Sequence, residues 1–113
     1  MPVPTPRDAA REDKVAREYA IQHDVKSWPY LFEATLSGRK KHDMRRVSDR
    51  DYQVGDTLRL CEYDPEMRSY TGRELRMRIS YITSAEYPCA LSGEGLDRDF
   101  CILSLERLSE QGK

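Results

Sequence analysis

Long hydrophobic runs are absent from this 113-residue sequence, and none approaches the roughly 18 residues that a membrane-spanning helix needs. The first residues also lack the basic stretch followed by an apolar core that marks a secretory signal peptide. Cysteine is scarce, and its odd number and wide spacing (Cys61, Cys89 and Cys101) argue against a disulfide framework. We therefore expect a cytoplasmic protein with reduced thiols and no membrane partner.

An excess of charge of either sign is missing as well. The net charge is −1 although charged residues make up 35% of the chain, so a basic binding surface must be local. The sequence has no glycine-rich phosphate loop, no Gly-x-Ser-x-Gly and no His-Glu-x-x-His motif. Its two histidines and three cysteines match no zinc-binding spacing, so we expect neither a metal site nor another cofactor.

Proline and charge set the N-terminal twenty residues apart from the rest. Three prolines within residues 1–6 predict an extended tail, because proline removes a backbone donor and fixes φ. Residues 7–19 are rich in alanine and in charges of both signs, which predicts a helix that is polar nearly all round. We expect one folded domain over residues 21–108, between an N-terminal extension (1–20) and a C-terminal tail (109–113).

A short buried helix is expected over residues 28–37. Ser27 suits its N-cap, and Pro29 suits its first turn, where the missing N–H costs nothing. Gly38 ends it, because glycine readily adopts the left-handed conformation that follows a helix. Trp28 is expected to fill the core at the start of this helix, although an aromatic ring near cations also suits base stacking.

Alternation of apolar and polar residues predicts the strands, which we place at residues 21–26, 41–47, 57–63, 75–83 and 100–105. The clearest strand would bury one face formed by Leu75, Met77, Ile79 and Tyr81. Loops are expected at residues 64–72 and at residues 84–98, the second with a helical turn. The fold class is therefore α+β: a small curled β-sheet or β-barrel with one or two short flanking helices and an N-terminal helical extension.

Residues 39–46, Arg-Lys-Lys-His-Asp-Met-Arg-Arg, concentrate five cationic side chains. On a strand, Lys41, Asp43 and Arg45 project to one side and the intervening residues to the other. Lys40 or Lys41 would clamp a phosphate together with Arg45, while Asp43 orients the arginine or accepts a donor of a base or sugar. The alternative is a solvated basic hairpin whose cations pair with nearby acidic residues, namely Asp49, Asp51 and Glu62.

The stretch Gly38-x-Lys40-x-x-Asp43-x-Arg45 resembles the signature of the ASCH domain family, Gly-x-Lys-x-x-Glu-x-Arg, within the PUA-like superfamily. Further blocks resemble a bacterial and phage branch of that family whose function is unassigned: residues 23–26, 32–34, 49–56, 62–63 and 70–74. The resemblance covers about residues 21–106. It implies a small β-barrel with flanking helices and a cleft beside the signature that binds RNA or nucleotides.

The resemblance favours a functional role for Lys40, Asp43 and Arg45, and the hypothesis of a nucleotide-binding module assigns roles to these and two further residues. Lys40, Arg45 and Arg50 would contact phosphate, Asp43 would read a donor, and Lys26 would line the same cleft from the end of the first strand.

Relatives among the acetylcytidine amidohydrolases use a lysine, a threonine three residues later and a distant glutamate. Here Lys40 matches the lysine, but Asp43 occupies the threonine position, and neither Glu86 nor Glu94 aligns with the acid. A carboxylate does not readily replace a hydroxyl nucleophile, although it can serve as a base for water.

Three functions follow. The first is an RNA- or nucleotide-binding module, which requires the cations to border an open cleft. The second is a small amidohydrolase or nuclease acting on modified nucleosides or RNA, with Lys40 and Asp43 as catalytic residues within hydrogen-bond reach of each other. The third is a bacterial or phage accessory factor that contacts another protein through its N-terminal helix. The sequence leaves open whether the protein is an enzyme, which ligand it takes and its oligomeric state.

Overall fold

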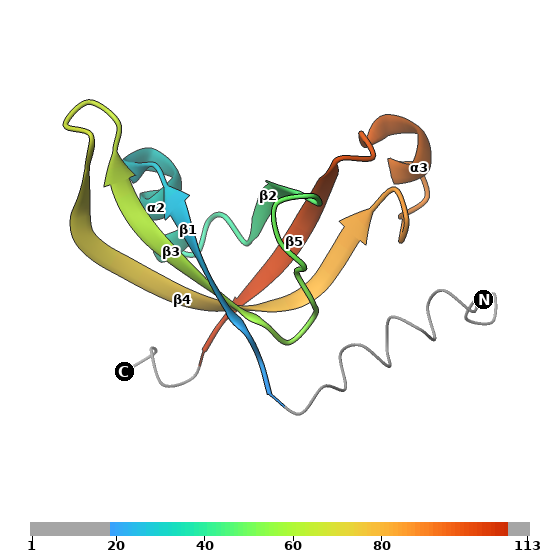
Figure 1. Cartoon of the computed structure of the whole chain (residues 1–113), viewed down its shortest axis with the longest axis horizontal. Coiled ribbons are helices and arrows are strands. Elements are labelled where there is room, and N and C mark those ends of the chain that lie inside the picture. The colour runs from blue at the N-terminus through green and yellow to red at the C-terminus, as the bar shows by residue number, and fades with distance from the viewer. Residues whose placement is uncertain (1–18, 109–113) are drawn as a thin grey trace.

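One mixed sheet of five strands organises the computed structural model, which describes residues 19–108 (Figure 1). In spatial order the strands are β1 (Gln22–Ser27), β3 (Thr57–Asp64), β4 (Ser69–Ser84), β5 (Phe100–Arg107) and β2 (His42–Arg46). Only β1 and β3 are parallel. Helix α2 (Pro29–Leu36) joins β1 to β2, and the single turn α3 (Ser92–Gly95) lies between β4 and β5. The predicted N-terminal extension and C-terminal tail lie outside the described residues, apart from positions 19 and 20.

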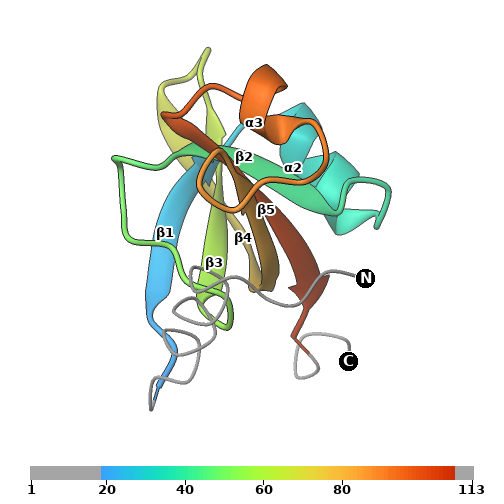
Figure 2. The same ribbon diagram turned by 90° about the vertical axis from the view of Figure 1, so that its right-hand side faces the viewer.

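The long strand β4 curls the sheet into a half-barrel. Its first part pairs with β3 and its second part with β5, and the register shifts between Ile79 and Tyr81, where a bulge bends the strand. Figure 1 shows the two arms that result, and Figure 2 shows the same half-barrel from the side. In both views α2, β2 and α3 gather at one end, away from the start of β1 and the end of β5. The predicted small curled sheet is confirmed.

The hydrophobic core fills the inner face of this half-barrel. Alternate residues of each strand point inward, as Leu58 and Leu60 of β3 and Leu103 and Leu105 of β5 illustrate. Phe32 of α2 is 1% exposed and packs into the same cluster. Burying one such side chain contributes roughly 1.5–3 kcal/mol, so these residues supply most of the force that holds α2 on the sheet.

Helix α2 begins one residue later than predicted. Ser27 is not its N-cap: it remains in β1, in register with Glu62, and is buried. Trp28 is the N-cap, with an extended backbone and no capping side chain, and its carbonyl accepts from the Phe32 N–H at 2.8 Å. Pro29 occupies the first helical position as expected. Gly38 follows the C-cap with φ +86°, the left-handed conformation predicted for it.

Three further predictions are wrong for local reasons. Trp28 is 48% exposed, because the N-cap position leaves its side chain outside the core. Tyr81 is 53% exposed, because the bulge after Ile79 shifts the alternation so that Ile82 takes the inner position. The second half of the predicted loop at residues 64–72 belongs to β4, because the hairpin closes already at Asp64 and Ser69.

Asp56 anchors the turn that leads into β3. Its side chain is fully buried and accepts hydrogen bonds from the backbone N–H groups of Gln53 (3.0 Å) and Ile21 (3.2 Å). Its Oδ2 also lies 2.8 Å from Nε2 of His23, which is itself buried in β1. One carboxylate therefore ties the start of β1 to the connection between β2 and β3.

A second buried carboxylate, Glu62, fastens the β3–β4 hairpin to α2. Its two oxygens accept from Nε (2.9 Å) and Nη2 (3.1 Å) of Arg73, and Thr71 donates a third hydrogen bond at 2.7 Å. Arg73 also donates to Glu33 of α2 at 2.9 Å, and its guanidinium lies 5.0 Å from the centre of the Phe32 ring. The hydrogen bonds from Arg73 and then from Thr71 lower the pKa of Glu62 below its ordinary 4.5.

Replacing Asp56 with alanine is expected to destabilise the fold by about 3 kcal/mol or more, because two buried donors, in His23 and Gln53, and the part-buried Ile21 N–H lose their acceptor. Urea unfolding followed by circular dichroism measures the loss. Asp24→Ala is the matched control, since Asp24 is exposed and its ion pair with Arg59 lies at the surface. Equal losses for the two variants would contradict the anchoring role of Asp56.

Glu62→Gln is expected to lower the free energy of unfolding near neutral pH and to matter less in acid. Because the pKa of Glu62 is lower in the folded state, its contribution is present above about 4.5 and is lost as the pH falls through the folded value. Urea midpoints at several pH values from about 7 to about 3 test this dependence. The control is Glu66→Gln, at an exposed position of the hairpin turn. A difference from wild type that stays constant over this range would refute the expectation.

Candidate functional site

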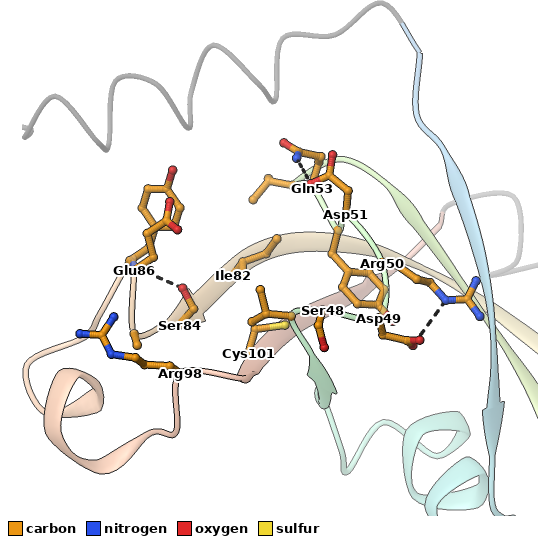
Figure 3. A pocket seen from close by; sticks show the side chains of 15 residues that line it. Ser48, Asp49, Arg50, Asp51, Gln53, Ile82, Ser84, Glu86, Arg98 and Cys101 are labelled. Atoms are coloured by element: carbon orange, nitrogen blue, oxygen red, sulfur yellow. Dashed lines mark hydrogen bonds and ion pairs between the residues drawn. The ribbon is translucent and has the colours of Figure 1, made fainter.

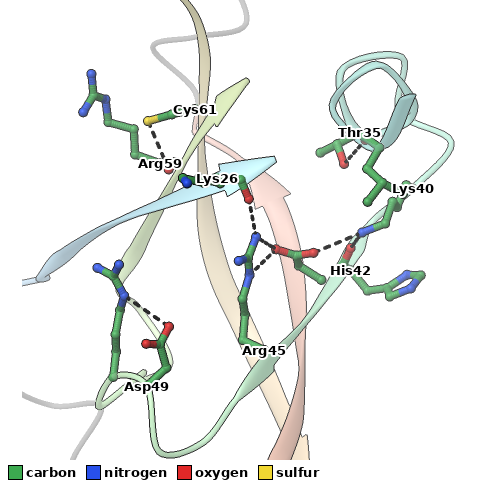
Figure 4. A network of polar contacts seen from close by, with 11 residues as sticks. Lys26, Thr35, Lys40, His42, Arg45, Asp49, Arg59 and Cys61 are labelled. Carbon is green, nitrogen blue, oxygen red and sulfur yellow. Dashed lines mark hydrogen bonds and ion pairs between the residues drawn. The ribbon is translucent and has the colours of Figure 1, made fainter. Parts of the chain in front are cut away.

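The signature residues Lys40, Asp43 and Arg45 form one hydrogen-bonded network where α2 leads into β2 (Figure 4). Gly38 turns the chain, and the Lys40 N–H donates to Ala34 at 2.9 Å, which holds the segment against the helix end. Lys40 Nζ donates to the His42 carbonyl and lies 3.4 Å from Asp43 Oδ1. Arg45 Nε donates to the other oxygen, Oδ2, at 2.8 Å.

Arg45 also connects the two edges of the sheet. Its Nη2 donates to the carbonyl oxygen of Lys26 at 2.8 Å, across the gap between β2 and β1 (Figure 4). These strands lie at opposite ends of the strand order and share no backbone ladder. A guanidinium can do this because its planar fork donates in two directions at once. Asp43 fixes the orientation of that fork.

Lys26 takes part in this network through its backbone only. Its side chain belongs to the exposed face of β1, opposite to the buried His23 and Val25, and its Nζ lies 4.1 Å from the centre of the Tyr63 ring. Tyr63 in turn packs edge-on against Tyr70, with ring centres 5.1 Å apart. The structure therefore places the Lys26 ammonium on the outer face, away from the side chains of Lys40 and Arg45.

A pocket of about 580 Å³ opens beside the network, and Arg50 lines it (Figure 3). Residues 47–54, the connection from β2 to β3, form one wall. The opposite wall comes from the end of β4 with the residues that follow it, together with Arg98. Arg50 lies 3.6 Å from Asp49, a loose ion pair between two exposed side chains. Lys40, Asp43 and Arg45 are not among the residues that line the pocket.

Tyr52 and Cys101 separate the pocket from the network. Both line the pocket and both are buried, and Cys101 pairs in register with Arg45 across β2 and β5. The Tyr52 ring packs on His23 with ring centres 4.9 Å apart. Burial raises the pKa of Tyr52 above its ordinary 10, an effect that Arg45 opposes, and burial also raises the pKa of the Cys101 thiol. Both groups therefore keep their protons near neutral pH.

Sequence reasoning found the network but not the pocket. Lys40, Asp43 and Arg45 come together as the signature suggested, and Arg50 lies apart from them in the pocket wall. Tyr52 falls within the resembling block of residues 49–56, yet nothing in that block distinguishes a pocket residue from a core residue. Arg98 gave no signal at all, because it is a single cation in a loop without periodicity.

The described residues contain no group of three His, Cys, Asp or Glu side chains placed to hold a metal ion. Cys61, Cys89 and Cys101 are free thiols. Within residues 19–108 no helix is long and apolar enough to cross a membrane.

Comparison with known proteins places these features in a family. A 12.9 kDa uncharacterized protein in the GpA 3′ region of Escherichia phage P2 is 38% identical to the chain over 61 residues. The match covers 54% of this chain and 53% of the phage protein, so it spans about half the length of each. A family model described as a domain of unknown function, DUF3850, matches residues 22–105, which hold every strand of the half-barrel apart from the last residues of β5. The chain therefore belongs to the DUF3850 family.

Proposed function

We propose that this protein is an RNA- or nucleotide-binding domain of the ASCH type, with its ligand in the pocket lined by Arg50 beside the network of Lys40, Asp43 and Arg45. The observation that carries the proposal is the pocket itself. Its volume of about 580 Å³ is within the range of small-molecule sites, and the segment 47–54 that forms one of its walls follows the basic motif directly in the chain. A solvated hairpin without a cavity would have favoured the alternative of a purely structural basic segment.

Two cations, Arg50 and Arg98, line the pocket together with three acidic residues, Asp49, Asp51 and Glu86, so a phosphate would be held by an individual guanidinium group and not by a net positive lining. Lys40, Arg45 and Asp43 sum to one positive charge (two cations less one carboxylate), and Lys41 adds another exposed cation just before β2. Arg50 is exposed at the pocket and held only by a long contact to Asp49, so its guanidinium is available to a phosphate. Because few phosphates would be neutralised, binding should be weak and sensitive to salt.

In this proposal the network positions the site rather than contacting the ligand through every member. Arg45 is engaged with Asp43 and the Lys26 carbonyl, and Asp43 accepts from a cation at each oxygen. Their joint effect is to fix β2, and with it the segment 47–54 that forms the pocket wall. Direct contact with an anionic ligand is then expected from the two guanidinium groups that line the pocket, Arg50 and Arg98, with Lys40 contributing to the local field.

An amidohydrolase or nuclease acting on modified nucleosides or RNA is the second candidate, because Lys40 and Asp43 do lie within hydrogen-bond reach at 3.4 Å. Two observations favour binding over catalysis. Neither residue lines the pocket, and both carboxylate oxygens of Asp43 already accept hydrogen bonds from cations. The third candidate, contact with a partner protein through residues 1–20, concerns a segment almost wholly outside the described residues.

A nuclear magnetic resonance titration of the isotopically labelled protein with nucleosides, nucleotides and short RNAs tests the proposal. We expect saturable amide shifts in residues 45–54 and around Arg98, weakening as salt is added. Arg50→Ala should weaken binding about tenfold, because a charge-assisted hydrogen bond to the ligand is lost. Lys40→Ala should weaken it as well. Arg78→Ala, which removes a cation paired with Glu106 on β5, is the matched control.

The same samples separate the candidates. New ligand signals that grow with time, and that Lys40→Ala or Asp43→Ala abolishes, would favour the hydrolase over a binding domain. A folded sample that shows no shift with any nucleoside, nucleotide or RNA would refute the proposed function.

A further inference from the structure

Two side chains at the pocket have unused hydrogen-bonding capacity. Tyr52 is 8% exposed, and its hydroxyl is the one buried side-chain oxygen or nitrogen among the described residues that has no hydrogen-bond partner. Arg98 is exposed and makes no hydrogen bond or ion pair with any described residue (Figure 3). Buried polar groups are nearly always satisfied, so a stranded hydroxyl needs an explanation. A ligand that supplies the missing partner is one.

The surroundings of Tyr52 hold its ring in place. The ring packs against His23, which lies 2.8 Å from the fully buried Asp56 carboxylate, so the aromatic plane has a rigid support. Because burial raises the pKa of Tyr52, the hydroxyl remains protonated and can both donate and accept. The segment 47–51 that precedes Tyr52 is exposed and lines the pocket, so it is the part of the wall that covers the buried hydroxyl from solvent and would have to move for a ligand to reach it.

Arg98 lies at the other wall of the pocket. In Figure 3 it extends from the loop before β5, on the opposite side of the cavity from Asp49 and Arg50. An unpaired guanidinium favours a phosphate, which it can bind through two parallel hydrogen bonds. A ligand that satisfies both groups is anionic at one end and carries a hydrogen-bonding group at the other, as a nucleotide does with its phosphate and its base or ribose.

We infer that the pocket binds one nucleoside monophosphate, with its phosphate on Arg98 and a polar atom of its base or ribose hydrogen-bonded to the Tyr52 hydroxyl. This inference rests on the proposed function and narrows it from RNA or nucleotide to a single nucleotide unit. A volume of about 580 Å³ suits one nucleotide unit. In a polynucleotide, the nucleotides on either side of that unit would have to lie outside the pocket.

Isothermal titration of the full chain with the four nucleoside monophosphates and the matching nucleosides tests the assignment. Wild type should bind at least one monophosphate about tenfold more tightly than its nucleoside, because the nucleoside lacks the charge-assisted contact. Arg98→Ala should abolish that preference and leave the affinity for the nucleoside unchanged. Arg78→Ala should keep the preference.

Tyr52→Phe isolates the hydroxyl, because the substitution keeps the ring and its packing on His23. The affinity for both the nucleotide and the nucleoside should fall about five- to tenfold, whereas the urea midpoint should stay the same or rise, since the lost hydroxyl had no partner in the fold. Tyr70→Phe, at a tyrosine that is 56% exposed on β4, is the matched control and should change neither quantity.

The outcomes separate this inference from the proposed function. If wild type binds neither nucleotides, nucleosides nor RNA, both fail. Binding of short RNA without binding of any monophosphate would overturn the inference and leave the proposed function standing. Binding of a monophosphate with undiminished affinity in Tyr52→Phe, or with its phosphate preference intact in Arg98→Ala, would also overturn the inference alone.

Discussion

The Arg45 guanidinium joins the two edge strands of the sheet, β2 and β1, at one end of the half-barrel. Five strands with β1 and β2 at the ends would form an open sheet, whose edges expose unpaired backbone groups. Arg45 reaches from β2 to the Lys26 carbonyl of β1 at 2.8 Å, while Asp43 and then Lys40 keep its side chain aligned. The curl that β4 introduces is thereby closed at one end.

Because Arg45 serves the fold in this way, the cations in residues 39–46 and in the connection that follows do not all have the same role. Cations that are close in the sequence have different roles in three dimensions: Arg45 in β2 stabilises the half-barrel, and Arg50 in the following connection is one of the residues that line a pocket. A charge engaged with a carboxylate and a carbonyl has less capacity for a ligand than one that is loosely held. Binding capacity therefore lies with the side chains that the fold leaves without firm partners.

Two buried carboxylates, Asp56 and Glu62, fasten other segments of the chain to the sheet. Asp56 ties β1 to the connection after β2, and Glu62 ties the β3–β4 hairpin to α2 through Arg73. Each has its oxygens satisfied by several donors, which is what makes a buried charge tolerable. Asp56 also holds His23, and the Tyr52 ring that lines the pocket packs against the His23 ring.

Local rules in the sequence determined most of the elements. Alternation placed the strands, Pro29 and Gly38 bounded the helix, and the spacing of Asp43 and Arg45 brought these two side chains to one face of β2. What tertiary structure alone decided depends on contacts distant in the chain. The bulge that exposes Tyr81 is set by pairing with β5, and the hydrogen bond from Arg45 to Lys26 spans 19 residues. Arg98 lines the same pocket as Arg50, on the opposite wall, only because the end of β4 and the start of β5 fold back beside the segment 47–54. Periodicity reports which way a side chain points from its own strand, and it carries no information about which distant strand or loop that side chain will face.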